Sequence, residues 1–173
     1  MINSKPELCD LLIGLLGQPA PENGQIFMDI IDQINEKPVL AFDFPSISEY
    51  NFPLSGISIS FDRDLRIFDC LVFELRCFEG SDRKPFTGRL PYGIKRTDSE
   101  QQVEQEFPGS TMRLKDYRFD ADLRPLAVQF VFQAAGHLDA SFGGERTLAL
   151  VVIDYADPKK NPNKAVSLGY DVR

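Results

Sequence analysis

The segment Phe61-Asp-Arg-Asp-Leu-Arg66 returns 58 residues later as Phe119-Asp-Ala-Asp-Leu-Arg124, and the rest of the chain is arranged around this pair. Each copy follows a short polar and apolar alternation and precedes a long apolar run. Asp-x-Asp tolerates the tight backbone of a turn, while the flanking Phe and Leu put apolar groups on the adjoining strands. Both copies therefore predict a β-hairpin. Their recurrence predicts two pseudo-repeated helix and hairpin units, at about residues 1–79 and 80–173, in a single globular domain of 173 residues.

Two helices are expected before the first hairpin. The first is predicted at about residues 5–16, because Ser4 and Glu7 can form a capping box, leucines follow at helical spacing, and Gly17 ends the pattern. The second is predicted over residues 25–35, where isoleucines and a phenylalanine share one face and acidic residues occupy much of the other. The leucine stripe of the first helix is typical of a core-facing surface.

The remaining segments complete an α+β pattern. Residues 37–56 contain three prolines and several aromatic residues, which indicates an irregular or short-stranded connection with unusually much apolar surface. A third helix is expected at about 98–107, where Thr97 and Glu100 form a second capping box, and a further strand over 147–155. No alternation of strands and helices demands a parallel crossover, so we expect an antiparallel sheet with the helices packed on one face.

The net charge of −7 is unevenly distributed. Residues 1–79 hold 13 Asp and Glu against 5 Lys and Arg, a net charge of −8, whereas residues 80–173 hold 13 against 14. The acidic first half would repel nucleic acid, whose binding depends on Lys and Arg that neutralise phosphates. A basic protein partner would instead be attracted to it, because complementary fields speed encounter.

The cysteines and the N-terminus predict a cytoplasmic protein. The three cysteines are widely spaced and form no Cys-x-x-Cys pair, which is typical of reduced thiols and not of a disulfide scaffold or zinc site. The first ten residues lack the apolar core of a signal peptide. No apolar run approaches the roughly 20 residues that span a bilayer, so no membrane association is expected.

Residue types that support catalysis or metal binding are sparse. The single histidine, His137, sits in a small-residue loop without a neighbouring nucleophile. The two Asp-x-Asp pairs resemble parts of a calcium loop, but neither is followed by the glycine and distal glutamate of an EF-hand. The basic residues within 83–96 lie near aromatics but form only a short cluster. We therefore expect no catalytic residues, no metal, no cofactor and no nucleic-acid partner.

One stretch resembles a known family. The order Leu90-Pro-Tyr-Gly-Ile94, then Asp98-Ser99, then Val103-Glu104 and a Pro-Gly stop resembles small bacterial immunity proteins of polymorphic toxin systems. The same helix and hairpin unit is similar to that of outer-membrane assembly lipoproteins, and tandem copies are similar to the β-lactamase inhibitory protein. The resemblance is best over residues 86–133. The Leu-Gly-x-Pro that usually follows such a helix occurs instead at residues 16–19. The resemblance to immunity proteins implies that this chain is an inhibitor that binds a co-produced toxin.

Two classes of function remain open at this point. A stoichiometric toxin inhibitor would use the acidic first half and a few aromatic anchors. Its candidate contacts are Asp29, Asp32, Glu36, Asp43, Glu49, Tyr50 and Phe52. The alternative is a small ligand-binding protein or enzyme with a cleft between the two halves. A secretion chaperone or adaptor would share the physics of the inhibitor but leave its partner active.

Overall fold

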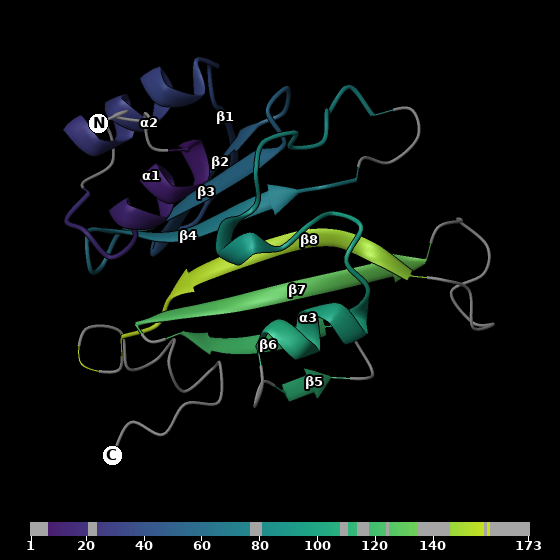
Figure 1. Cartoon of the computed structure of the whole chain (residues 1–173). Coiled ribbons are helices and arrows are strands. Elements are labelled where there is room, and N and C mark those ends of the chain that lie inside the picture. The colour runs from purple at the N-terminus through teal and green to yellow at the C-terminus, as the bar shows by residue number, and fades with distance from the viewer. Residues whose placement is uncertain are drawn as a thin grey trace, which may run out of the picture.

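Eight strands form one antiparallel sheet in the order β1-β2-β3-β4-β8-β7-β6-β5 (Figure 1). The computed structural model describes residues 7–20, 24–76, 81–107, 111–113, 118–123, 125–134, 146–157 and 159. In chain order the elements are α1 (Leu8–Leu15), α2 (Gln25–Ile34), β1 (Val39–Asp43), β2 (Ile47–Phe52), β3 (Ile57–Asp62), β4 (Ile67–Glu74), the 3₁₀ turn η1 (Pro91–Gly93), α3 (Glu100–Glu106), β5 (Thr111–Arg113), β6 (Arg118–Leu123), β7 (Leu126–Ala134) and β8 (Arg146–Tyr155). The predicted α+β class is confirmed.

The three helices pack on the same face of the sheet, as Figure 1 shows. From α2, Phe27 meets Phe61 of β3 with ring centroids 5.4 Å apart, and at the end of α3 Phe107 meets Phe130 of β7 at 5.2 Å. The connection before η1 lies on this face too, since Phe86 packs on Phe73 at 4.6 Å. We call this side of the sheet the helix side.

The core lies between the helices and the sheet and is built largely of phenylalanine. The largest fully buried side chains are Phe52, Phe61, Phe68, Phe73, Phe130, Phe132, Leu12, Ile30, Ile57, Ile59 and Leu71. Each such side chain stabilises the fold by roughly 1.5–3 kcal/mol relative to exposure. On β3 the alternation predicted from the sequence is realised, because Ile57, Ile59 and Phe61 all face the helices.

The helix ends follow from local chemistry. Gly17 stops α1 with a left-handed backbone, at φ +77°, and its N–H donates to Phe68 O at 2.8 Å. Asn35 ends α2 at φ 56°, a conformation that Asn tolerates better than most residues. For α3 the predicted capping box is wrong by two residues. Ser99, not Thr97, is the N-cap, and its partner is Gln102, because Asp98 is held in the preceding turn by Lys95 N–H.

The two Phe-Asp-x-Asp-Leu-Arg segments occupy different places in the sheet. The first lies at the end of β3 and in the β3–β4 turn, where Asp62 Oδ1 accepts a bond from Leu65 N–H at 2.8 Å. In the second, residues 118–123 are strand β6, so Asp120 lies opposite Gln129 within the ladder. Both segments belong to hairpins. The pseudo-repeat predicted from them is nevertheless not confirmed, although residues 39–74 and 111–155 each supply four consecutive strands.

Other expectations need adjustment. The proline-rich segment 37–56 forms the β1–β2 hairpin. Leu90-Pro-Tyr-Gly-Ile94 contains a 3₁₀ turn, where the resembled family would have a strand. The start of the first helix before residue 7, His137 and the tail after residue 159 lie outside the described residues.

Candidate functional site: the open face of the sheet

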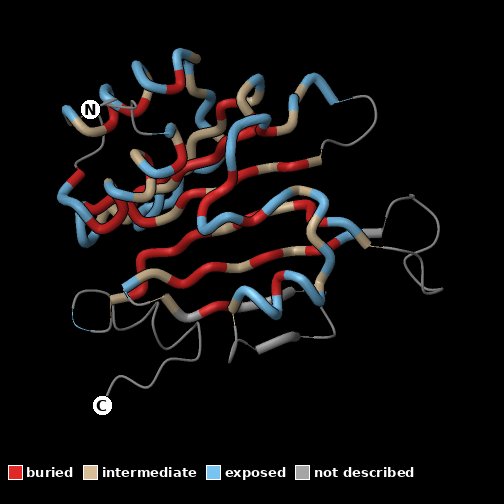
Figure 2. Tube along the Cα trace, in the orientation of Figure 1, coloured by how far each residue is buried: buried red, intermediate tan, exposed pale blue. Residues whose placement is uncertain are grey.

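The side of the sheet opposite the helices is partly exposed, and we call it the open face. Along β4, Leu71 and Phe73 are fully buried on the helix side, whereas the alternate residues Cys70, Val72 and Glu74 are half-buried. The neighbouring strands place residues on the same face, because Cys70 lies opposite Ser60 of β3 on one side and opposite Asp154 of β8 on the other. The alternation appears along the central strands in Figure 2. Within the described part of the chain, no helix covers this face.

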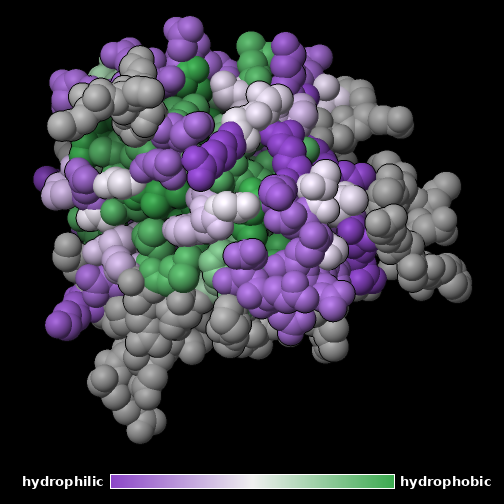
Figure 3. Space-filling view, in the orientation of Figure 1, coloured by the Kyte–Doolittle hydropathy of each residue, from purple (hydrophilic) through white to green (hydrophobic). Residues whose placement is uncertain are grey.

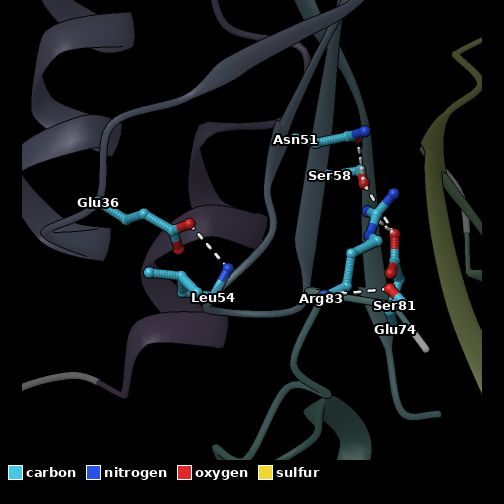
Figure 4. A network of polar contacts seen from close by, with 7 residues as sticks. All are labelled: Glu36, Asn51, Leu54, Ser58, Glu74, Ser81 and Arg83. Atoms are coloured by element: carbon cyan, nitrogen blue, oxygen red, sulfur yellow. Dashed lines mark hydrogen bonds and ion pairs between the residues drawn. The ribbon is translucent and has the colours of Figure 1, made fainter. Parts of the chain in front are cut away.

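A polar network anchors the chain at one end of the open face (Figure 4). The Arg83 guanidinium forms an ion pair with Glu74. The Ser58 hydroxyl donates to Asn51 Oδ1 at 2.7 Å and also lies 3.2 Å from Glu74 Oε1. The backbone is tied down as well, since Lys84 N–H donates to Pro53 O at 2.7 Å. Arg83 therefore has a structural role and is not a free cation for a ligand.

Carboxylates are spread across the open face. They belong to Glu49 on β2 and Glu74 on β4, which are half-buried, and to Asp154 on β8, which is buried. Burial raises the pKa of Glu49, against the attraction of Arg83, and the neighbouring Glu74 charge raises it further. Asp154 is held by Gln129, whose Nε2 donates to Asp154 Oδ2 at 3.4 Å. Neighbouring strands are about 4.8 Å apart, so these groups are spaced over several strands and do not converge on one point.

An apolar cluster adjoins these carboxylates at the β1 edge of the sheet, and we call it the apolar edge. It consists of Val39, Phe42, Phe44 and Ile47, whose exposed fractions are 55%, 53%, 59% and 40%. The Phe42 and Phe44 rings stack with centroids 6.1 Å apart. Phe42 lies opposite Glu49 and Val39 opposite Asn51, so both share the open face with the carboxylates. Neighbouring exposed apolar side chains of this kind are a common mark of an interaction site.

The candidate contacts predicted from the sequence do not form one surface. Asp29 and Asp32 are exposed on α2, and Asp29 accepts a bond from Gln25 Nε2 at 2.6 Å. Glu36 is used internally, because its Oε1 accepts from Leu54 N–H at 2.8 Å (Figure 4). Asp43 is exposed and pairs with Arg63 at 2.6 Å. Of the acidic candidates, Glu49 alone lies on the open face.

The two aromatic candidates belong to the core instead of the surface. Phe52 is fully buried. Tyr50 packs against Phe27 with centroids 4.7 Å apart and against Phe61 at 6.2 Å. Both face the helices because they alternate with Glu49 and Asn51 along β2. Within residues 37–56 the exposed aromatics are Phe42 and Phe44. The sequence signal for them was the unusual apolar content of residues 37–56.

A cavity of about 490 Å³ lies elsewhere, on the helix side. It is bounded by the start of α1, the β2–β3 turn and the segment 84–89, and its charged lining residues are Glu7, Lys84 and Arg89. Cys9 also lines it, but burial and the nearby Asp10 raise the pKa of this thiol to about 11, so it is protonated at neutral pH. The cavity is lined by residues of both predicted halves, within 7–57 and 84–89, whereas His137 lies outside the described residues.

The helix side has an uneven surface. In Figure 3 the region of α3 is hydrophilic, while hydrophobic residues are visible around α1. Along α1, Leu8, Leu11 and Leu15 are partly buried and pack against the core. No described helix has both the length and the apolar character needed to cross a bilayer. No group of His, Cys, Asp and Glu suited to a metal ion occurs among the described residues.

No family model, curated protein or solved structure matches this chain. Its function must therefore be inferred from the open face, the apolar edge and the charges around them.

Proposed function

We propose that this chain is a stoichiometric protein inhibitor: a cytoplasmic immunity protein that binds a co-produced bacterial toxin and has no catalytic activity of its own. The observation that supports this proposal is the open face, where the half-buried polar side chains of Glu49, Ser60, Glu74 and Gln129 extend over β2, β3, β4 and β7. A small substrate or a metal ion needs groups that converge on one point. Charges spread over several strands suit the surface of a macromolecule.

The charge distribution favours a basic partner. Residues 1–79 have a net charge of −8, with 13 acidic and 5 basic side chains. One of those basic residues, Arg63, already pairs with Asp43. Complementary fields accelerate encounter and lose their effect as salt screens them. A toxin that acts on nucleic acid has a basic substrate-binding surface, so an acidic inhibitor matches it well.

The resemblance of residues 86–133 to small immunity proteins supports the same proposal. Within that stretch, the Ser99 capping box and the buried Val103 of α3 are present. The 3₁₀ turn at η1 departs from the resembled pattern. The resemblance therefore supports the class of function and not the details of the interface.

Co-expression tests this proposal. The protein encoded beside this chain is expressed alone and together with it, and growth, co-elution and enzymatic activity of the complex are measured. We expect arrest by the neighbour alone, rescue by this chain, and a stable 1:1 complex in which the toxin is inactive. A neighbour that is harmless alone and elutes separately would overturn the proposal. A stable complex in which the neighbour stays active would indicate a secretion chaperone.

The helix-side cavity supports a second candidate, a small ligand-binding protein. Its size is in the range of small-molecule sites, and Lys84 and Arg89 at its rim suit an anion. A thermal-shift screen with small carboxylates and phosphates tests this candidate. A stabilising ligand whose effect disappears in Arg89→Ser would favour it, whereas a flat screen would count against it.

A further inference from the structure

The apolar edge is held rigidly by the two turns beside it. Phe44 and Ile47 exchange backbone bonds, with Phe44 N–H donating to Ile47 O at 2.9 Å and Ile47 N–H donating to Phe44 O at 3.3 Å. Arg63, from the β3–β4 turn, donates from Nη1 to Phe44 O at 2.8 Å, and its N–H donates to Ser46 O at 2.8 Å. The exposed rings thus stand on a fixed backbone. A partner that binds them loses little conformational freedom on this side of the interface.

The backbone of β1 is poorly suited to pairing with another strand. β1 has five residues, and its register shifts between Leu40 and Phe42. Proline precedes it at position 38 and follows it at position 45. Bulges, prolines and short length are the devices that keep an edge strand from adding a further strand. A partner is therefore recognised through the side chains of the apolar edge and not through main-chain pairing.

The surrounding charge identifies the kind of partner. Glu49 lies opposite Phe42 and Asp62 lies opposite Ile47, while Arg63, which pairs with Asp43, is a basic residue beside them. Asp43 and Glu49 lie directly beside the apolar edge, at its end and opposite Phe42. A second copy of this chain would bring the same acidic residues into contact, and like charges across an interface oppose association. A basic protein surface with an apolar recess would be attracted by these acidic residues and would bury the apolar edge at the centre of the interface.

We propose that Phe42 and Phe44, with Val39 and Ile47, are the anchor through which this chain binds a basic protein surface, and that Asp43 and Glu49 beside them form the acidic rim of the same interface. This inference rests on the proposed function, because the expected partner is the toxin. It assigns the energetic centre of the interface to the β1–β2 hairpin, outside the set of contacts that charge and aromatic content alone suggested. Buried aromatic anchors surrounded by a polar rim are the usual arrangement of binding hot spots.

The test compares the double variant Phe42→Ser/Phe44→Ser with a matched control, Leu54→Ser/Leu65→Ser. The control removes two other exposed apolar side chains, which are 58% and 41% exposed. Binding of each variant to the purified neighbouring-gene protein is measured by calorimetry or interferometry. We expect the double variant to weaken binding by about 100-fold or more, as hot-spot aromatics do, and the control to stay within about threefold of the wild type. Circular dichroism and melting curves verify that both variants fold.

Salt dependence tests the acidic rim. Glu49→Gln should slow association at low ionic strength and reduce its dependence on salt, while leaving dissociation nearly unchanged. Equal binding by the wild type and the Phe42→Ser/Phe44→Ser variant would refute the inference that these two residues anchor the interface, and the proposed function would still stand. Failure of the wild type to bind at all would instead overturn the proposed function. A wild-type dimer that the double variant converts to a monomer would show that a second copy occupies the apolar edge, which also overturns the inference.

Discussion

Replacement of Gly56 by alanine should destabilise the fold much more than a typical surface substitution. Gly56 lies in the β2–β3 turn at φ +64°, beneath the segment that leads to Phe86. A Cβ atom there would lie 2.1 Å from Phe86 N, 2.6 Å from Pro85 C and 2.7 Å from Lys84 O. All three are backbone atoms, so no side-chain rotation relieves the contact. The segment 84–86 must move by more than an ångström to restore ordinary separations.

The cost follows from what that segment holds. Alanine at a left-handed φ costs about 1 kcal/mol. Displacement breaks the bonds from Lys84 N–H to Pro53 O and from Phe86 N–H to Glu74 O, each 2.7 Å long and each contributing about 1 kcal/mol. It also loosens Phe86, which is 4% exposed and packs on Phe73, and partial exposure of such a ring costs about 1 kcal/mol. The total is about 4 kcal/mol, which corresponds to a fall in Tm of roughly 10 °C for a chain of this size.

Two other glycines provide controls for this experiment. Gly93 has φ +76° but nothing within 4 Å of its Cβ position, so Gly93→Ala should cost only the backbone term of about 1 kcal/mol. Gly14 is in α1 with open space around it, and Gly14→Ala should stabilise by about 0.5–1 kcal/mol. Urea unfolding followed by circular dichroism gives the three free energies of unfolding. If Gly56→Ala were no more destabilising than Gly93→Ala, the packing of the 84–86 segment on this turn would be wrong.

Three further predictions concern α3, the open face and the buried thiol. Ser99→Ala should lower the free energy of unfolding by about 1 kcal/mol, while Thr97→Ala should change it by less than about 0.5 kcal/mol; the reverse order in urea midpoints would place the cap at Thr97. The pKa of Glu49 is raised in the folded state, so its contribution to stability is present at low pH and is lost as pH rises through the folded pKa. Glu49→Gln should therefore stabilise the protein at pH 7 relative to the wild type, with the difference disappearing below pH about 4, and equal unfolding curves at pH 7 would contradict this. Because its pKa is about 11, the Cys9 thiol should react with iodoacetamide at pH 8 far more slowly in the native protein than in urea. The rates are measured in a variant that retains Cys9 as its one cysteine. Comparable rates in the two conditions would show that the thiol is not shielded.

Local patterns predicted several elements well. The structure confirms the apolar face predicted for α2 and the alternation predicted for β3. Helical and strand periodicities place these residues on one face of the element, and this does not depend on which other element packs against it. Gly17 also ends α1 as expected, since a left-handed residue is a local requirement. The capping box of α3 shows how narrow the local signal is. Thr97 and Ser99 both have suitable residues three positions later, and the bond from Lys95 N–H to Asp98 decides in favour of Ser99.

The proposed binding surface was harder to predict from the sequence. The aromatic residues of 37–56 are similar in type, yet Phe52 is buried and Phe42 is about half exposed. The difference arises because Phe52 faces the helix side from the interior strand β2, whereas Phe42 lies on the open face of the edge strand β1. A one-dimensional pattern does not specify which strand ends the sheet. For this reason the aromatic candidates named from composition were interior residues, and the exposed ones were identified only by the fold.

The sequence by itself determined the acidic character of the first half, the α+β class and the approximate places of the helices and of most central strands, because charge and hydrophobic period are properties of neighbouring residues. The tertiary structure decided that β4 pairs with β8, that two similar hexapeptides occupy different strands, and that Phe42 and Phe44 lie together at an exposed edge beside Glu49. Those outcomes depend on contacts between residues distant in the chain. Their energies are set by which surfaces are buried together, and that is known only once the whole sheet has formed.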